Sequence, residues 1–152
     1  MHIYDNDIDE INNAIDIFNQ YLSEHKVPRL VADFTDARPK PMVINDNKRG
    51  VYFIFGHRAN KCEENILGVY IGKASLNSCI GTRVRHHCRN YYRPQHNSII
   101  CNDRRAVPYV LKHIASIELE SAGLVFMTPA LEEFLISHLK EKIKLINGTG
   151  NI

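Results

Sequence analysis

The sequence is most easily characterised by what is missing from its 152 residues. No apolar run approaches the roughly 20 residues that a membrane-spanning helix needs, so no membrane association is expected. The first residues lack the basic segment and the apolar segment of a secretory signal. None of the four cysteines belongs to a CxxC pair. These absences predict a cytoplasmic protein with free thiols rather than a secreted protein held by disulfides.

Acidic residues are missing from one long stretch of the chain and basic residues from another. No Asp or Glu occurs from Ala74 to Asn102, whereas every Asp, Glu, Lys or Arg before Lys26 is acidic. The basic residues in and around the acid-free stretch are Lys73, Arg83, Arg85, Arg89, Arg93, Arg104 and Arg105. The net charge of +2 conceals this asymmetry. The pattern predicts either a phosphate-facing side or a merely solvated basic helix, and charge alone does not choose between them.

Length and composition are those of one folded domain. The chain is 44% hydrophobic and 24% charged, and its length can bury a core without disulfides. We predict that residues 1–48 form an N-terminal helical extension packed on a core of residues 49–152. A helix is expected over 7–24, because apolar residues recur there at three- and four-residue steps. Prolines break the pattern over 27–48, with a short strand expected at 42–44.

A hairpin follows, with strands predicted over 50–55 and 66–72. In the first strand, Val51, Phe53 and Phe55 share one face, and Tyr52 lies on the other. In the second, Tyr70 stands between two glycines and is predicted to be exposed. Glycine weakens a strand and often marks the close approach of a ligand, although tyrosine is also common in ordinary strands.

The next predicted helix covers residues 80–91. Arg83 and His87 lie four residues apart beside its apolar stripe, while Arg85 and Arg89 fall on the solvent side. Residues 93–106 are interpreted as a polar loop and 108–113 as a short helix. A third strand is expected within 114–127.

The last helix is expected from Thr128, as its cap, to about Lys144. Glu132 aligns with the apolar stripe of this helix, whereas its neighbour Glu133 lies on the polar face. A carboxylate in a buried register is costly unless it is paired with a cation or bound to a metal. Both alternatives stay open, and the pairing alternative predicts an arginine nearby.

The two tyrosine strands resemble the two motifs that name the GIY-YIG nuclease family. Tyr52 matches the tyrosine of the first motif, in which Val51 replaces isoleucine. Tyr70–Gly72 matches the second motif as written, and Lys73 follows as in the excision-repair branch. The resemblance continues downstream and covers about residues 49–147. Its further positions are Arg83, His87, Glu132 and Asn147. His87 is similar to a histidine of the homing and restriction branches.

The resemblance implies an α/β protein of α+β type, with a small central three-stranded antiparallel sheet flanked by helices. It also implies a metal-dependent endonuclease that hydrolyses DNA phosphodiester bonds, alone, as a homodimer or with a partner protein. Glu132 would hold the metal, Mg²⁺ or Mn²⁺. The implied catalytic residues are Tyr52, Tyr70, Arg83, His87 and Glu132. The implied substrate-binding residues are Gly72, Lys73, Arg85, Arg89 and Asn147.

The general base stays open in this interpretation. A tyrosine with an unperturbed pKa near 10 is a poor base at neutral pH, so Tyr52 would need neighbouring cations. Arg83, Lys73 and the metal are the expected sources, and Tyr70 or His87 could assist.

Three other functions remain possible on sequence grounds. The first is a catalytically silent nucleic-acid-binding module with the same fold. The second is a zinc-stabilised interaction domain that uses Cys79, Cys88, His96 and Cys101. The third is a covalent tyrosyl-DNA mechanism, which does not need a metal-binding glutamate. No appended element that reads bases is evident, so the DNA target is left open.

Overall fold

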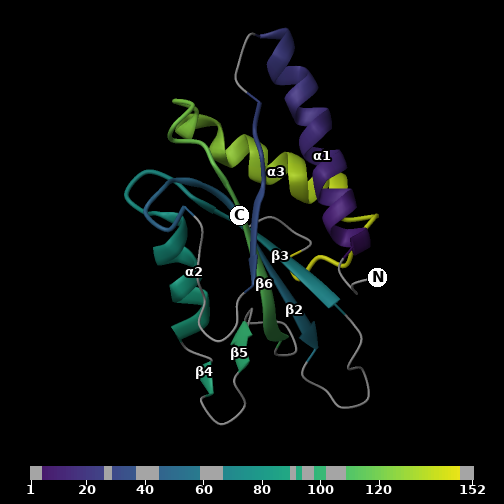
Figure 1. Ribbon diagram of the computed structural model, residues 1–152, viewed down its shortest axis with the longest axis vertical. Coiled ribbons are helices and arrows are strands. Elements are labelled where there is room, and N and C mark those ends of the chain that lie inside the picture. Colours follow the sequence, from purple (N-terminus) through teal and green to yellow (C-terminus); the bar gives the residue numbers. More distant parts are fainter. Residues whose placement is uncertain are drawn as a thin grey trace.

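The computed structural model describes residues 5–25, 29–36, 45–58, 67–89, 92–93, 98–101 and 109–147. The fold is α+β, as predicted, with three helices packed on an antiparallel sheet (Figure 1). In these ranges no helix combines the length and the hydropathy that crossing a membrane requires. The strand expected at 42–44 lies outside the described residues.

Three long strands form the centre of the sheet, in the order β3-β2-β6. Their bounds are β2 Gly50–Arg58, β3 Leu67–Ala74 and β6 Tyr109–Glu118. Two short strands, β1 (Asp33–Asp36) and β5 (Ser98–Cys101), pair with different parts of β6, and β4 (Tyr92–Arg93) pairs with β5. The predicted three-stranded sheet is therefore the centre of a six-stranded one. The added strands have two to four residues, too few for alternation to reveal them.

The region before β6 differs from the prediction. The expected loop over 93–106 contains part of β4 and all of β5. The helix expected over 108–113 is wrong, because residues 109–113 begin β6 and pair with β2. A proline at 108 suggested a helix start, but the pairing of Val110 with His57 and of Leu111 with Gly56 decides the conformation. Tertiary pairing here overrides a local signal.

Both faces of the sheet are buried. The face of Val51, Phe53 and Phe55 packs against α1 (Asp5–Glu24) and α3 (Thr128–Leu139). The face of Tyr52 packs against α2 (Ile80–Arg89), which Figure 1 shows apart from the α1–α3 pair. The predicted hairpin and its alternation are thus confirmed. The predicted exposure of Tyr70 is wrong, because Tyr70 lies beneath α2 and is only 8% exposed.

The N-terminal helix contributes to this shared core. Its predicted bounds, 7–24, agree with α1 within two residues, and its buried side chains include Ile11, Ile15 and Leu22. The ring of Phe18 packs on that of Phe134 in α3, with the centroids 5.3 Å apart. Residues 1–48 therefore add a helix to the core and, through β1, a strand to the sheet.

The last helix starts where expected but is shorter. Thr128 is its first residue rather than its cap, and the Thr128 hydroxyl donates to the Val125 carbonyl at 2.7 Å. The helix ends at Leu139, not near Lys144, because the chain turns there and continues alongside β3. The Val69 amide donates to the Lys144 carbonyl at 2.9 Å. This segment covers part of the outer edge of β3.

Candidate active site

Four of the predicted catalytic side chains meet where α2 crosses the hairpin. The helix presents Arg83 and His87 one turn apart, toward the face of β2 and β3 that carries Tyr52 and Tyr70. The Tyr52 hydroxyl lies 2.9 Å from His87 Nε2. The Tyr70 and His87 rings have centroids 4.6 Å apart, and the two tyrosine rings are 6.3 Å apart. The sequence order predicted this grouping, and the fold brings it together.

Tyr52 lies at the centre of this group. It is fully buried, and burial raises the pKa of the Tyr52 hydroxyl above its usual range, with Tyr70 adding to the effect. The positive charge of Arg83 opposes the rise without cancelling it. The imidazole tautomer decides which of the two groups, the Tyr52 hydroxyl or His87 Nε2, is the donor.

The direction of this shift does not favour Tyr52 as a base, because desolvation outweighs the cation beside it. The identity of the general base stays a prediction. His87 and Arg83 are only half-buried, so they are the members of this group that solvent and substrate can reach.

Gly72 makes room for the Tyr52 ring. The two residues are cross-strand partners in the β2–β3 ladder. A Cβ atom on Gly72 would lie 2.4 Å from both Cζ and the hydroxyl oxygen of Tyr52. Any side chain at this position would displace the ring. The glycine of the second motif thus serves the geometry of the tyrosine of the first.

A second group of charges lies at the same edge strand. The Lys73 ammonium donates to Glu132 Oε2 of α3 at 2.5 Å. Glu132 is 2% exposed and is the one buried charged residue in the described ranges, while the Lys73 side chain is 32% exposed. The negative charge of Glu132 contributes to the raised pKa of Tyr52, so the two groups interact across β3. The partner of Glu132 is a lysine, not the expected arginine.

The choice of Glu132 over its neighbour agrees with the helix register, since Glu133 is exposed. Asn147 uses its side-chain amide on the backbone of β3: its Oδ1 accepts from the Ile71 amide at 2.9 Å and its Nδ2 donates to the Ile71 carbonyl. Asn147 therefore anchors the strand that carries Tyr70 and Lys73. Arg85 is exposed and pairs with Asp46 at 2.5 Å. The side chain of Arg89 lies outside the description.

The donors present limit which metal ion the site could hold. Within the described ranges, no group of three or more His, Cys, Asp or Glu side chains could hold a metal ion. The zinc alternative depends on Cys88, His96 and Cys101, whose side chains are not described. A single buried carboxylate fits an ion such as Mg²⁺, which keeps several waters and is completed by substrate phosphates. Glu132 is the residue that would hold it.

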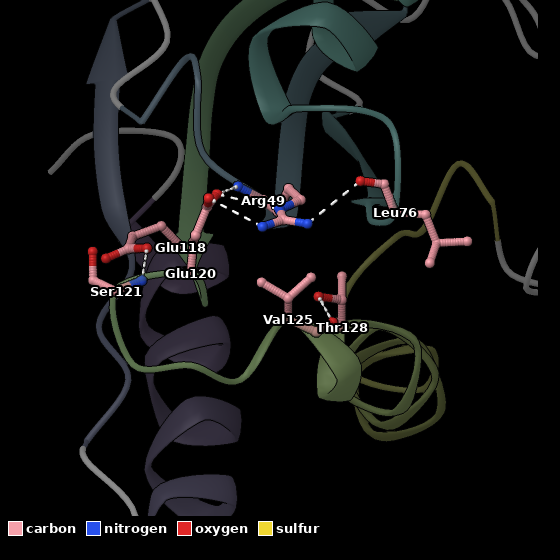
Figure 2. Close-up of polar contacts among 7 residues, drawn as sticks. All are labelled: Arg49, Leu76, Glu118, Glu120, Ser121, Val125 and Thr128. Atoms are coloured by element: carbon pink, nitrogen blue, oxygen red, sulfur yellow. Dashed lines mark hydrogen bonds and ion pairs between the residues drawn. The ribbon is translucent and has the colours of Figure 1, made fainter.

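Sequence reasoning missed one polar cluster next to the site. Arg49, directly before β2, donates two hydrogen bonds to Glu120: Nη2 lies 3.1 Å from Oε1 and Nε lies 3.3 Å from Oε2. Its Nη1 donates to the Leu76 carbonyl at 3.5 Å (Figure 2). The guanidinium hydrogen bonds lower the pKa of Glu120. The cluster ties the turn after β6 to the loop after β3. No spacing of residues in the sequence predicts this cluster, because its members lie far apart along the chain.

Leu76, in that loop, has a backbone φ of 56°. The left-handed region is unfavourable for a branched side chain by roughly 1–2 kcal/mol. No feature of the sequence predicts a left-handed backbone at this position.

Comparisons of the chain with family models, curated proteins and solved structures find no match. The resemblance described above therefore depends on the motifs of this chain alone.

Proposed function

We propose that this protein is a metal-dependent DNA endonuclease that hydrolyses phosphodiester bonds at the edge of β3. The observation that carries the proposal is the grouping of Arg83 and the hydrogen-bonded Tyr52 and His87 on one face of the hairpin, with the buried Glu132–Lys73 pair across β3. Two half-exposed groups able to bind phosphate and accept a proton are thus separated from a buried carboxylate by one strand. Perturbed titratable groups gathered in this way are typical of active sites.

Arg83 is assigned to the scissile phosphate. Its guanidinium presents a fork of donors that matches two phosphate oxygens, a geometry that lysine does not reproduce. The fork stabilises the charge that builds on phosphorus in the transition state. Lys73, with a third of its side chain exposed, supplies a further cation at the edge of β3.

His87 is assigned as the general base. Neutral imidazole accepts a proton near neutral pH, whereas the Tyr52 hydroxyl is buried and keeps its own. With its Nε2–H donating to the Tyr52 oxygen, His87 takes a proton from water at Nδ1, the water oxygen bonds to phosphorus, and the bond from phosphorus to the 3′ oxygen breaks. The leaving oxygen gains its proton from solvent. Tyr52 is then a positioning residue that orients the imidazole.

Glu132 is assigned to Mg²⁺ or Mn²⁺. A bound divalent ion would supply neutralisation of phosphate charge and stabilisation of the leaving oxygen. The burial of Glu132 keeps the carboxylate in one place, and Lys73 holds its orientation.

The direct test is cleavage of supercoiled plasmid by the purified protein. We expect conversion to nicked or linear DNA with Mg²⁺ or Mn²⁺, and none in EDTA. Equal cleavage in EDTA would contradict the metal assignment, and no cleavage with either ion would contradict the proposed activity.

The salt bridge between Lys73 and Glu132 favours a second candidate, a silent nucleic-acid-binding module, because the carboxylate is already paired. The same plasmid assay distinguishes the two functions, since a silent module slows the migration of DNA in a gel without cutting it.

A further prediction concerns Tyr52→Phe. We expect a loss of about 1 kcal/mol of stability from the buried hydrogen bond, together with a large fall in cleavage rate. Thermal melting and single-turnover cleavage measure the two effects. An unaltered cleavage rate with only reduced stability would assign Tyr52 to the scaffold.

A further inference from the structure

Two large apolar side chains near the site are exposed to solvent. Leu76 is 81% exposed and Phe126 is 77% exposed, and they are the two most exposed large apolar residues in the described ranges. Single exposed apolar residues are ordinary on protein surfaces, so exposure alone decides nothing. Their positions are informative: Leu76 follows Lys73 by three residues, and Phe126 lies in the 3-10 turn that leads into the helix of Glu132.

The backbone of Leu76 provides an independent observation. Its positive φ suits glycine or asparagine, and leucine gains nothing there from packing. The loop is nevertheless held in place, because Arg49 donates to the Leu76 carbonyl while it forks onto Glu120 (Figure 2). Burial of the leucine side chain does not offset this strain. Strain of this kind is typical of functional positions.

Phe126 is anchored in a comparable way. Its turn, Val125–Met127, is closed by the Met127 amide donating to the Leu124 carbonyl at 2.8 Å. The Thr128 hydroxyl donates to the Val125 carbonyl at 2.7 Å, as Figure 2 shows. Both apolar side chains therefore project from rigid loops that lead directly to the Lys73–Glu132 pair.

We propose that Leu76 and Phe126 insert between the bases of DNA bound at the site and open the stack beside the scissile phosphate. This proposal rests on the proposed nuclease function. Leucine and phenylalanine are side chains that proteins use as wedges between base steps, and two isolated side chains suit a wedge better than a flat protein interface. The cations Lys73 and Arg83 place the DNA backbone next to them. Substrates that unstack easily, at pyrimidine–purine steps or mismatches, should therefore be preferred.

The test uses a duplex with 2-aminopurine at a pyrimidine–purine step, mixed with the Glu132→Gln protein and Mg²⁺ so that the DNA is not cut. We expect fluorescence to rise severalfold on binding, and this rise to be lost when Leu76→Ser or Phe126→Ser is added. Val31→Ser, at a residue 62% exposed outside the site, is the matched control and should leave the rise unchanged.

Cleavage by the active protein supplies the second measurement. Leu76→Ser and Phe126→Ser should slow cleavage of an intact duplex at least tenfold, but slow cleavage of a duplex with a mismatch at the same step less than threefold. Equal losses of cleavage rate on both duplexes, or no fluorescence change with the unmodified loops, would contradict the proposed insertion between bases. Neither result would contradict the proposed nuclease activity. A monomer–dimer equilibrium altered by Leu76→Ser would overturn the proposed insertion in favour of self-association. Absence of any cleavage by the unaltered chain would instead defeat the proposed function.

Discussion

Glu132→Gln should reduce metal-dependent plasmid cleavage by at least about 100-fold while DNA binding persists. The buried carboxylate is the proposed metal ligand, and the charge stabilisation that a metal supplies is worth several kcal/mol. The amide keeps the shape of the side chain but not its charge. Lys73 loses its partner, yet its side chain is a third exposed and can be hydrated instead. The melting temperature should therefore change little.

The matched control is Glu133→Gln, which alters the neighbouring, exposed carboxylate of the same helix. It should retain nearly normal cleavage and stability. Plasmid nicking, DNA retardation and thermal melting are measured for both variants. Loss of activity in Glu133→Gln alone would reverse the assignment, and full activity in both would place the metal elsewhere.

Arg83→Lys should lose about 100-fold or more in cleavage rate although the positive charge is kept. Donors aimed at transition-state charge are each worth roughly 2.7–4 kcal/mol. Lysine cannot present the planar fork of donors that matches two phosphate oxygens. The effect should appear in the rate of single-turnover cleavage rather than in DNA affinity.

Arg85→Lys is the control on the same helix, because Arg85 is exposed and paired with Asp46. It should cleave at close to the normal rate. Near-normal cleavage by Arg83→Lys would show that Arg83 acts only as a cation or a scaffold residue.

Much of the fold followed from periodicity in the chain. The N-terminal helix, the hairpin and the alternation of Val51, Tyr52 and Phe53 were predictable, because each rests on a pattern several residues long. The short strands β1, β4 and β5 were not, since two to four residues carry no usable period. The mistaken helix over 108–113 arose in the same way, from a local signal that pairing with β2 outweighed.

The candidate site was predicted as a set of residues but not as an arrangement. The motif resemblance nominated Tyr52, Tyr70, Arg83, His87 and Glu132. It did not reveal that Tyr52 is buried and has a raised pKa, because burial depends on α2 packing over the hairpin. The Arg49 cluster and the strained Leu76 likewise depend on segments that are distant in sequence.

By itself, then, the sequence determined which side chains are available and which helix or strand face each occupies, because helical and strand periods are local properties. It placed Glu132 on a buried face and Glu133 on an exposed one. Only the tertiary structure decided the partners: Lys73 for Glu132, His87 for Tyr52, and the Ile71 backbone for Asn147. Partners are set by the packing of elements far apart in the chain, and that packing also sets the desolvation that raises the pKa of Tyr52.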